Sequence, residues 1–332
     1  YFSPLSSDGI AGNCQGDVNS TENITYNSQT RLSFARTFGG HSVDVLAGYE
    51  VKNWKREYMA GRAQNYATDK KEVLDNASSL MYIGHNKDSD ALVSYVARAN
   101  YDYLKRYYLS VSFRRDGSSR LHPSNRWDNF WAVSGAWRLT QEEFRKNVTW
   151  LNEAKLRVSY GVNGNIPNGL YSYYGLYSLG YSYNDQPGMV ESSLANNTLS
   201  WERNYALNAG IDFRLFGRVG VSFDWYSRNT KDLLLSKSVN PITGFGSITD
   251  NVGELHNTGV ELEINATVID NRDFIWISAL NLSHNKNTIV KLADLPQYTS
   301  GIYIVKEGYS LNTIYRREYA GVDPQTGKPT YY

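Results

Sequence analysis

A cluster of tyrosines between residues 169 and 185 contains the side chains best suited to binding a ligand. The segment reads GLYSYYGLYSLGYSYND, with glycine and serine between the rings. Rings can stack on the apolar faces of sugars while hydroxyl groups bond their edges, and ligand pockets commonly combine aromatic walls with a few polar groups. The same rings could instead pack on neighbouring loops or on a partner protein, and the sequence favours neither interpretation. The candidate substrate-binding residues here are Tyr171, Tyr173, Tyr174, Tyr177 and Tyr181.

A second polar segment, SFRRDGSSRL at 112–121, lies between two ring-rich runs, YYLSV and WDNFWAVSGAW. Aromatic side chains settle at membrane–water boundaries, so this arrangement is typical of a chain that leaves a membrane, turns and enters it again. We predict a loop over 115–128 and add Arg115 and Asp116 as candidate substrate-binding residues.

The sequence gives little support for catalysis or for a cofactor. The five histidines are scattered without an HExxH pair, and no GxSxG segment occurs. Asn86, Asp88 and Asp90 have the alternate spacing of a calcium loop, but alanine stands at its glycine position, Ala91, and at its glutamate position, Ala97. We expect a protein that is not an enzyme, with no catalytic residues, no metal and no cofactor. A structural calcium ion in an extracellular loop is the less favoured alternative.

The composition excludes some partners. The net charge of the 332 residues is +1, which gives no electrostatic case for nucleic acid binding. Aromatic residues make up 14% and charged residues only 20%. A single cysteine, Cys14, excludes an internal disulfide framework.

Strands must position these residues, because the dominant period in hydrophobicity is two. In 260–268, for example, Val260, Leu262 and Ile264 alternate with Glu261 and Glu263. Such alternation marks strands with one apolar face. The pattern predicts ten strands, at about 24–38, 42–58, 91–104, 107–114, 129–139, 154–162, 201–215, 219–232, 258–270 and 274–285.

The connections between these strands alternate between short and long. Tight turns are predicted at 39–40, 105–106, 215–218 and 270–273, together with a short helix in 140–153 whose Thr140 and Glu143 have capping-box spacing. Long connections are predicted over 59–90, 115–128, 163–200, 233–257 and from 286 onward. Short turns at one end and long loops at the other are typical of an all-β, transmembrane, up-and-down antiparallel β-barrel. A large soluble β-sandwich is the alternative that alternation alone leaves open.

Several long phrases, in order over roughly 90–332, resemble the SusC-like TonB-dependent outer-membrane transporters (the SusC/RagA family) of Bacteroidetes. Residues 1–90 resemble the family more weakly. The phrases are FRRDGSSRL followed by NRWDNFWAVSGAWRLTQEEF, LRVSYGVNGN (156–165), WERNYALNAGIDFRLFGRVGVSFDWYSRNTKDLLL (201–235), VGELHNTGVELEI (252–264), NLSHNKN (281–287) and AGVDPQTGKPTYY (320–332).

The resemblance implies a barrel of 22 strands in the outer membrane of a Gram-negative bacterium, with an N-terminal plug domain inside it. It also implies a SusD-like surface lipoprotein as partner, energy supplied through TonB, and import of oligosaccharides or, in some members, peptides. The ten predicted strands would make up under half of such a barrel. We therefore expect residues 1–332 to be a partial barrel domain, an interior fragment without the plug or the final strands.

Charged side chains on the polar faces of the strands must then face the lumen, since each would cost up to about 2–4 kcal/mol near the middle of a lipid face. We expect them to pair chiefly with one another and with a plug rather than with substrate. The lumen-facing charges are Arg98, Asp102, Arg114, Asp212, Arg228 and Glu261.

Two other classes of function remain as alternatives. One is an extracellular carbohydrate-binding or adhesive β-sheet protein. The other is a surface glycosidase, which needs two carboxylates across a cleft. Nothing in the sequence singles out Glu261 and Glu263 for that role.

Overall fold

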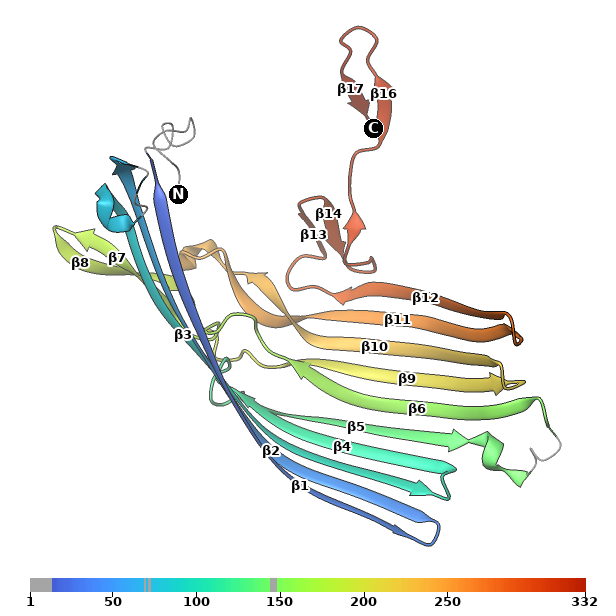
Figure 1. Ribbon diagram of the computed structural model, residues 1–332. Coiled ribbons are helices and arrows are strands. Elements are labelled where there is room, and N and C mark those ends of the chain that lie inside the picture. The colour runs from blue at the N-terminus through green and yellow to red at the C-terminus, as the bar shows by residue number, and fades with distance from the viewer. Residues whose placement is uncertain (1–13, 69, 71–72, 144–147) are drawn as a thin grey trace. The chain divides into compact units, whose positions relative to one another are not determined.

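The computed structural model describes residues 14–68, 70, 73–143 and 148–332, most of which lie in strands (Figure 1). Ten strands form one sheet in the order β1-β2-β3-β4-β5-β6-β9-β10-β11-β12. From β4 to β12 each neighbouring pair is antiparallel. The strands are β1 Gly16–Phe38, β2 His41–Tyr66, β3 Ala77–Tyr103, β4 Tyr107–Ser118, β5 Trp127–Arg138, β6 Leu151–Asn165, β9 Glu202–Leu215, β10 Val219–Ser238, β11 Ser247–Asp270 and β12 Ile275–Lys291.

The ten predicted strands are confirmed, but the loop-side ends of several were wrong. Residues 59–90 and 233–257 were predicted as loops, whereas β2 and β3 are joined only by 67–76, and β10 and β11 only by 239–246. A bilayer is crossed by about 9–11 strand residues, and β3 has 27. Beyond the apolar layer a strand needs no apolar face, so its ladder continues while the alternation in the sequence disappears.

The chain divides into two compact units. The first holds the residues up to Thr30 and Glu50–Val93, and the second holds Arg31–Tyr49 and Ser94–Tyr332. The first unit contains parts of β1, β2 and β3 with the short 3-10 helix η1, Leu74–Asn76. Exposed ion pairs join its strands: Arg62 bonds Asp17, and Glu57 accepts from His85 Nε2 at 2.9 Å.

In the second unit the sheet has one apolar and one polar face. Along β4 the exposed side chains are Tyr107, Leu109, Val111 and Phe113, between 41% and 47% exposed, and the alternate positions are half-buried. The register carries this division across the sheet, so Trp225 of β10 and Leu282 of β12 are also exposed. We call the two sides the apolar face and the polar face. The other sheets in the described residues have only two or three strands, too few to form the second layer of a sandwich, so the sandwich alternative is wrong.

Tight turns join the strands at one end of the sheet, seen at β9–β10 and β11–β12 in Figure 1. At the β3–β4 turn, Leu104 and Lys105 both have positive φ, of 54° each, and Arg106 N donates to Tyr103 O at 2.9 Å. Two consecutive left-handed residues form the hairpin turn whose twist matches that of the flanking strands.

The capped helix predicted over 140–153 is wrong in the described part of that range. A 3-10 turn, η2, covers Leu139–Gln141 without a side-chain cap, and β6 begins at Leu151, while 144–147 lie outside the described residues. Thr140 lies buried inside the turn, where it cannot act as a cap. The next residue but one, Glu142, accepts from Tyr107 Oη at 2.6 Å and from Trp137 Nε1 at 3.1 Å. These bonds, the one from Tyr107 foremost, hold the pKa of Glu142 below its usual value.

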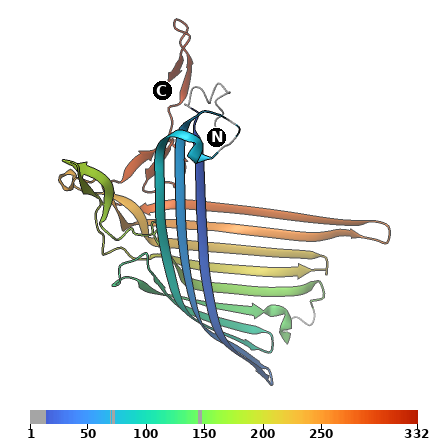
Figure 2. The ribbon, with the colours of Figure 1, turned by 60° about the vertical axis from the view of Figure 1, so that its left-hand side comes forward.

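Smaller sheets lie in the long connections. Figure 2 shows the β7–β8 hairpin at the end of the second unit opposite the tight turns, which we call the loop end. Its strands, and the remaining short elements, are β7 Leu176–Tyr183, β8 Gln186–Ser193, η4 Pro241–Thr243, β13 Gln297–Ser300, β14 Tyr303–Lys306, β15 Thr313–Ile314, β16 Tyr319–Val322 and β17 Pro329–Tyr331. No helix in the described chain has the length and apolar character to span a membrane.

The two faces predict effects of different size for a new charge. Val111→Lys places a cation on the apolar face and should lower the free energy of unfolding in lipid by about 2–4 kcal/mol. Ser112→Lys, one residue along on the polar face, should change it by less than about 1 kcal/mol. Denaturant titration of the full-length protein in lipid vesicles measures both. Equal losses for the two variants would contradict this assignment of the faces.

Candidate functional site

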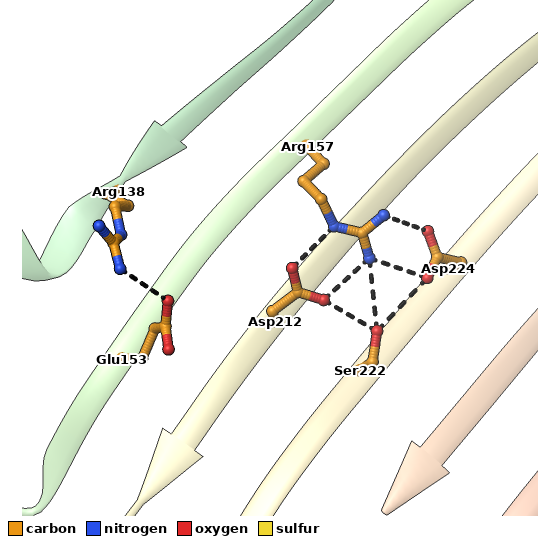
Figure 3. Close-up of polar contacts among 6 residues, drawn as sticks. All are labelled: Arg138, Glu153, Arg157, Asp212, Ser222 and Asp224. Carbon is orange, nitrogen blue, oxygen red and sulfur yellow. Dashed lines mark hydrogen bonds and ion pairs between the residues drawn. The ribbon is translucent and has the colours of Figure 1, made fainter. Parts of the chain in front are cut away.

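An arginine centred between two aspartates organises the polar face (Figure 3). Arg157 projects from β6 and reaches two strands. Its Nε and Nη2 bond the carboxylate of Asp212 on β9 at 2.7 and 2.9 Å, and its Nη1 and Nη2 bond that of Asp224 on β10 at 3.1 and 2.9 Å. Ser222 Oγ donates to Asp212 Oδ1 at 2.8 Å. Planar guanidinium groups suit such paired contacts with carboxylates.

A glycine makes this reach possible. The register places Gly210 of β9 between Arg157 and Asp224. A Cβ at position 210 would collide with Asp224 Oδ1 and stand 2.8 Å from Arg157 Nη2. The missing side chain therefore gives the guanidinium its path across β9. Arg138 and Glu153 make a second ion pair nearby, at 3.2 Å between Nη2 and Oε1 (Figure 3).

A cavity of about 690 Å³ in the second unit adjoins the arginine. Asn100 links two of its walls, since its Nδ2 donates to Asp44 Oδ1 at 3.0 Å and its Oδ1 accepts from Ser110 Oγ at 2.7 Å. Lys155 and Arg157 add positive charge to the lining. The mixture of amides, hydroxyls and both signs of charge can hydrogen-bond a polar ligand or another polar protein surface.

All six predicted lumen-facing charges fall on the polar face, but the structure does not bring them together. Asp102 caps the β3–β4 turn by accepting from Lys105 N at 3.2 Å, and Arg98 Nε donates to Asn100 at 3.1 Å. Arg228 lies 5.0 Å from the ring of Tyr226. Glu261 stands opposite Asp224 in the register, and Asp212 belongs to the Arg157 cluster. Arg114 binds both carboxylate oxygens of Asp116, at 2.6 and 2.8 Å.

Arg115 and Asp116 were predicted in a loop and lie in β4, so that prediction was wrong for both. The strand continues to Ser118, and the two side chains therefore take opposite faces. Asp116 is only 8% exposed and is bonded by Arg114, while the Arg115 guanidinium lies 5.7 Å from the Trp127 ring.

The connections at the loop end pack into a small core of their own. Leu121 and Leu199 are fully buried, and Trp201 meets Phe130 edge to face at 5.2 Å between ring centroids. Trp201 Nε1 donates to the backbone carbonyl of Arg126 at 3.0 Å. The polar segment that follows β4 is therefore anchored against the chain that precedes β9.

The five candidate tyrosines fall into two groups. Tyr171, Tyr173 and Tyr174 lie in the turn before β7, where Tyr173 is 5% exposed, and burial raises the pKa of its phenol. Tyr173 packs on Tyr174 at 4.0 Å between ring centroids, so its ring faces are occupied by protein. Tyr177 and Tyr181 lie in β7 and are 58% and 55% exposed.

Some polar residues that make contacts at the loop end were not predicted from the sequence. Asp128 binds Arg203 through Nε and Nη2, both at 2.8 Å, and buried Glu202 accepts from Asn165 Nδ2 at 2.9 Å. No alternation marks them, because they lie where the strands leave the apolar layer. Lys155 on the polar face could have been found, since it is two residues before Arg157 on one strand.

No group of three His, Cys, Asp or Glu side chains in the described chain is arranged to hold a metal ion. Asn86, Asp88 and Asp90 stand within β3, whose extended backbone differs from the tight turn of a calcium loop.

Loss of the central arginine should leave two carboxylates without their partner. Arg157→Met is expected to lower the free energy of unfolding of the full-length protein in lipid by about 1–3 kcal/mol. Arg228→Met is a matched control, because among the described residues its guanidinium contacts the ring of Tyr226, a contact worth about 0.5–1 kcal/mol. Adding Asp212→Asn and Asp224→Asn to Arg157→Met should recover most of the loss. Equal effects of the two arginine variants would show that the cluster is not stabilising.

Comparison with known proteins places these features in context. Residues 2–329 match the family described as "TonB dependent receptor-like, beta-barrel". TonB-dependent receptor P39 of Formosa agariphila is 35% identical over 315 residues, which is 92% of this chain and 30% of the relative. TonB-dependent receptor SusC of Bacteroides thetaiotaomicron is 32% identical over 340 residues, 95% of this chain and 33% of the relative.

The fold also matches solved structures. The RagAB peptide transporter superposes with a TM-score of 0.88 at 29% identity, over 96% of this chain and 36% of the matched chain. The same importer in its "closed-closed" state gives a TM-score of 0.87 over 95% of this chain. The chain spans about a third of the length of the relatives it matches, from 30% to 36% in these comparisons.

Proposed function

The chain belongs to the TonB-dependent receptor β-barrel family, and from that premise we propose that it forms part of an outer-membrane transporter of the SusC/RagA type. The observation that carries the proposal is the division of one antiparallel sheet into an uncovered apolar face and an ion-paired polar face. Lipid can cover the first and a water-filled or protein-filled lumen the second.

The location follows from the same division. Only helices and closed barrels satisfy every backbone group inside a membrane, and the relatives are TonB-dependent receptors of Gram-negative bacteria. We place this protein in the outer membrane, with its tight turns toward the periplasm and its long connections outside, as in other barrels of this kind.

The cargo we propose is an oligosaccharide or a peptide. A SusC relative and the RagAB peptide importer point to the SusC/RagA type of transporter. Tyr174, Tyr177 and Tyr181, from 48% to 58% exposed at the loop end, offer ring faces that suit sugars or peptide side chains. The partners we propose are a SusD-like surface lipoprotein outside and TonB, which supplies energy, on the periplasmic side.

Uptake in the organism that encodes the protein tests the proposal. A deletion strain, and the same strain carrying the full-length gene, would be grown on panels of oligosaccharides and of oligopeptides as limiting nutrients. We expect the gene to restore growth on members of one panel, and an affinity-tagged copy to co-purify a lipoprotein. Purified full-length protein that is water-soluble without detergent, or restored growth on neither panel, would contradict the proposal.

Exposed rings at the loop end should matter for that uptake. Removing Tyr177 and Tyr181 together by alanine substitution should lower the initial uptake rate at low substrate concentration by about 5- to 150-fold, because each of the two ring contacts contributes about 0.5–1.5 kcal/mol. Tyr298→Ala removes a similarly exposed ring, 44% exposed, from β13 and should leave uptake unchanged. Equal uptake in both variants and wild type would exclude these rings from substrate binding.

A further inference from the structure

The β7–β8 hairpin forms a two-stranded sheet of its own at the loop end (Figure 2). Within the described chain, β7 pairs with β8 and with no other strand. In an antiparallel pair, alternate residues direct their backbone N–H and C=O groups away from the partner strand. The outer edge of β7 therefore carries a row of backbone donors and acceptors, and such a row can pair with a further strand.

The two strands of the hairpin differ in how their outer edges are protected. β8 reads QPGMVESS and carries Pro187 and Glu191, and both proline and charge discourage pairing at an edge. β7 reads LYSLGYSY and has neither. A bulge at Gly180, where φ is 90°, divides the edge of β7 but leaves regular strand on both sides of it. The open edge of the hairpin is therefore that of β7.

Pro187 also identifies an outward-facing residue of β7. It stands opposite Ser182, and because proline has no amide hydrogen, these two residues cannot exchange both hydrogen bonds of a bonded pair. They form the alternate kind of pair, in which the backbone groups of each residue point away from the other strand. The N–H and C=O groups of Ser182 therefore lie on the outer edge of β7.

A cavity of about 370 Å³ adjoins the foot of the hairpin. Leu176, the first residue of β7, and Ser193, the last of β8, both line it. The other described residues of the lining include Leu170, Ile248 and Ser236, and none of them is charged. Ligand pockets commonly combine an apolar lining with a few polar groups. An uncharged side chain suits this cavity.

The backbone of the edge selects the chemistry of its occupant. Outward donors and acceptors recur at every second residue, and an extended polypeptide presents the same repeat, as it does when a peptide adds a strand to a sheet. A sugar chain has no such alternation of N–H and C=O groups. An oligosaccharide is therefore a poor partner for this edge.

The size of the edge favours a short peptide over a folded protein. The eight residues of β7 span about 26 Å, so at a sheet thickness of ~10 Å the edge covers roughly 260 Å². A stable interface between folded proteins buries about 800 Å² on each partner. An oligopeptide needs no larger surface than the edge and the cavity provide.

We propose that the β7 edge and the cavity at its foot bind a short, uncharged peptide in an extended conformation. Its backbone adds a third strand beside β7, and one of its side chains enters the cavity. The exposed rings of Tyr177 and Tyr181 on β7 pack against its other side chains. This inference rests on the transport function proposed above and makes the cargo a peptide rather than an oligosaccharide.

Binding of a defined peptide to the full-length protein in lipid nanodiscs tests the site. The probe is the acetylated and amidated heptapeptide Thr-Val-Thr-Tyr-Thr-Val-Thr, titrated by calorimetry. Single N-methylation at each position in turn removes one backbone donor of the probe. We expect weaker binding at alternate positions and little change at those between, because only every second donor faces β7. Equal effects at neighbouring positions, or no binding of the probe, would overturn the proposed strand addition.

Ser182 offers a matched pair of variants. Ser182→Pro removes an outward donor of the edge without removing a bond to β8. Ser182→Ala lacks the same side chain and keeps the donor. The proline variant should bind the probe about 2- to 13-fold more weakly than the alanine variant, which corresponds to one net hydrogen bond. Equal affinities of the two variants would show that the edge of β7 does not bind the peptide backbone.

The cavity can be tested in the same titration. Ser236→Phe places a ring in the cavity and should weaken binding of the probe several-fold. Ser238→Phe introduces the same ring two residues along β10, outside the lining, and should leave the affinity unchanged. Equal affinities of these two variants would remove the cavity from the proposed site.

Growth of the deletion strain separates failure of this site from failure of the transporter. Growth on oligopeptides that is slower with Ser182→Pro than with Ser182→Ala would support both. Growth restored on oligosaccharides alone would overturn the peptide site and leave the transporter in place, whereas growth restored on neither panel would overturn both. Dimers of the purified protein that Ser182→Pro abolishes would overturn the peptide site in favour of a second copy of the chain.

Discussion

Pairing of backbone groups between neighbouring strands is the constraint on which the rest of the molecule depends. In a bilayer an unpaired amide or carbonyl has no water to bond, so each spanning strand must be continuously paired with the next. The antiparallel ladders from β4 to β12 meet this requirement along their length. Once the ladder is fixed, alternation sends successive side chains to opposite sides, and the two faces can be specialised independently.

The polar face is held together by ion pairs and hydrogen bonds rather than by a hydrophobic core. Arg157 links β6 to β9 and β10, and Asn100 joins β3 to Asp44 of β2 and Ser110 of β4. Buried apolar side chains gather instead at the loop end, around Leu121 and Leu199. The spanning layer and the loop end are therefore stabilised by different interactions.

Sequence patterning predicted the spanning layer well because lipid imposes a strong periodic signal there. The strand around Val111 and the turn at Lys105 follow from alternation and from tight-turn spacing. The same signal is absent from the loop-side ends of the strands, which is why the sequence predicts loops at 59–66, 77–90 and around Asp116, where the structure has strands. The capping-box spacing of Thr140 failed for another reason, since the acidic residue that matters, Glu142, bonds two interfacial rings instead of a helix end. The partners Asp128 and Arg203 are 75 residues apart and carry no local signal.

The absence of a side chain at Gly210 also affects which alignment the strands adopt during folding. Sliding one strand past another by two residues keeps every apolar side chain on the apolar face, so that face cannot distinguish the correct alignment from its nearest rivals. Such a slip of β9 against β6 would bring Asn208 or Asp212 opposite Arg157, where only a glycine leaves the guanidinium room to cross. The arginine, the glycine and Asp224 together therefore favour the observed alignment of β6, β9 and β10 over alignments shifted by two residues.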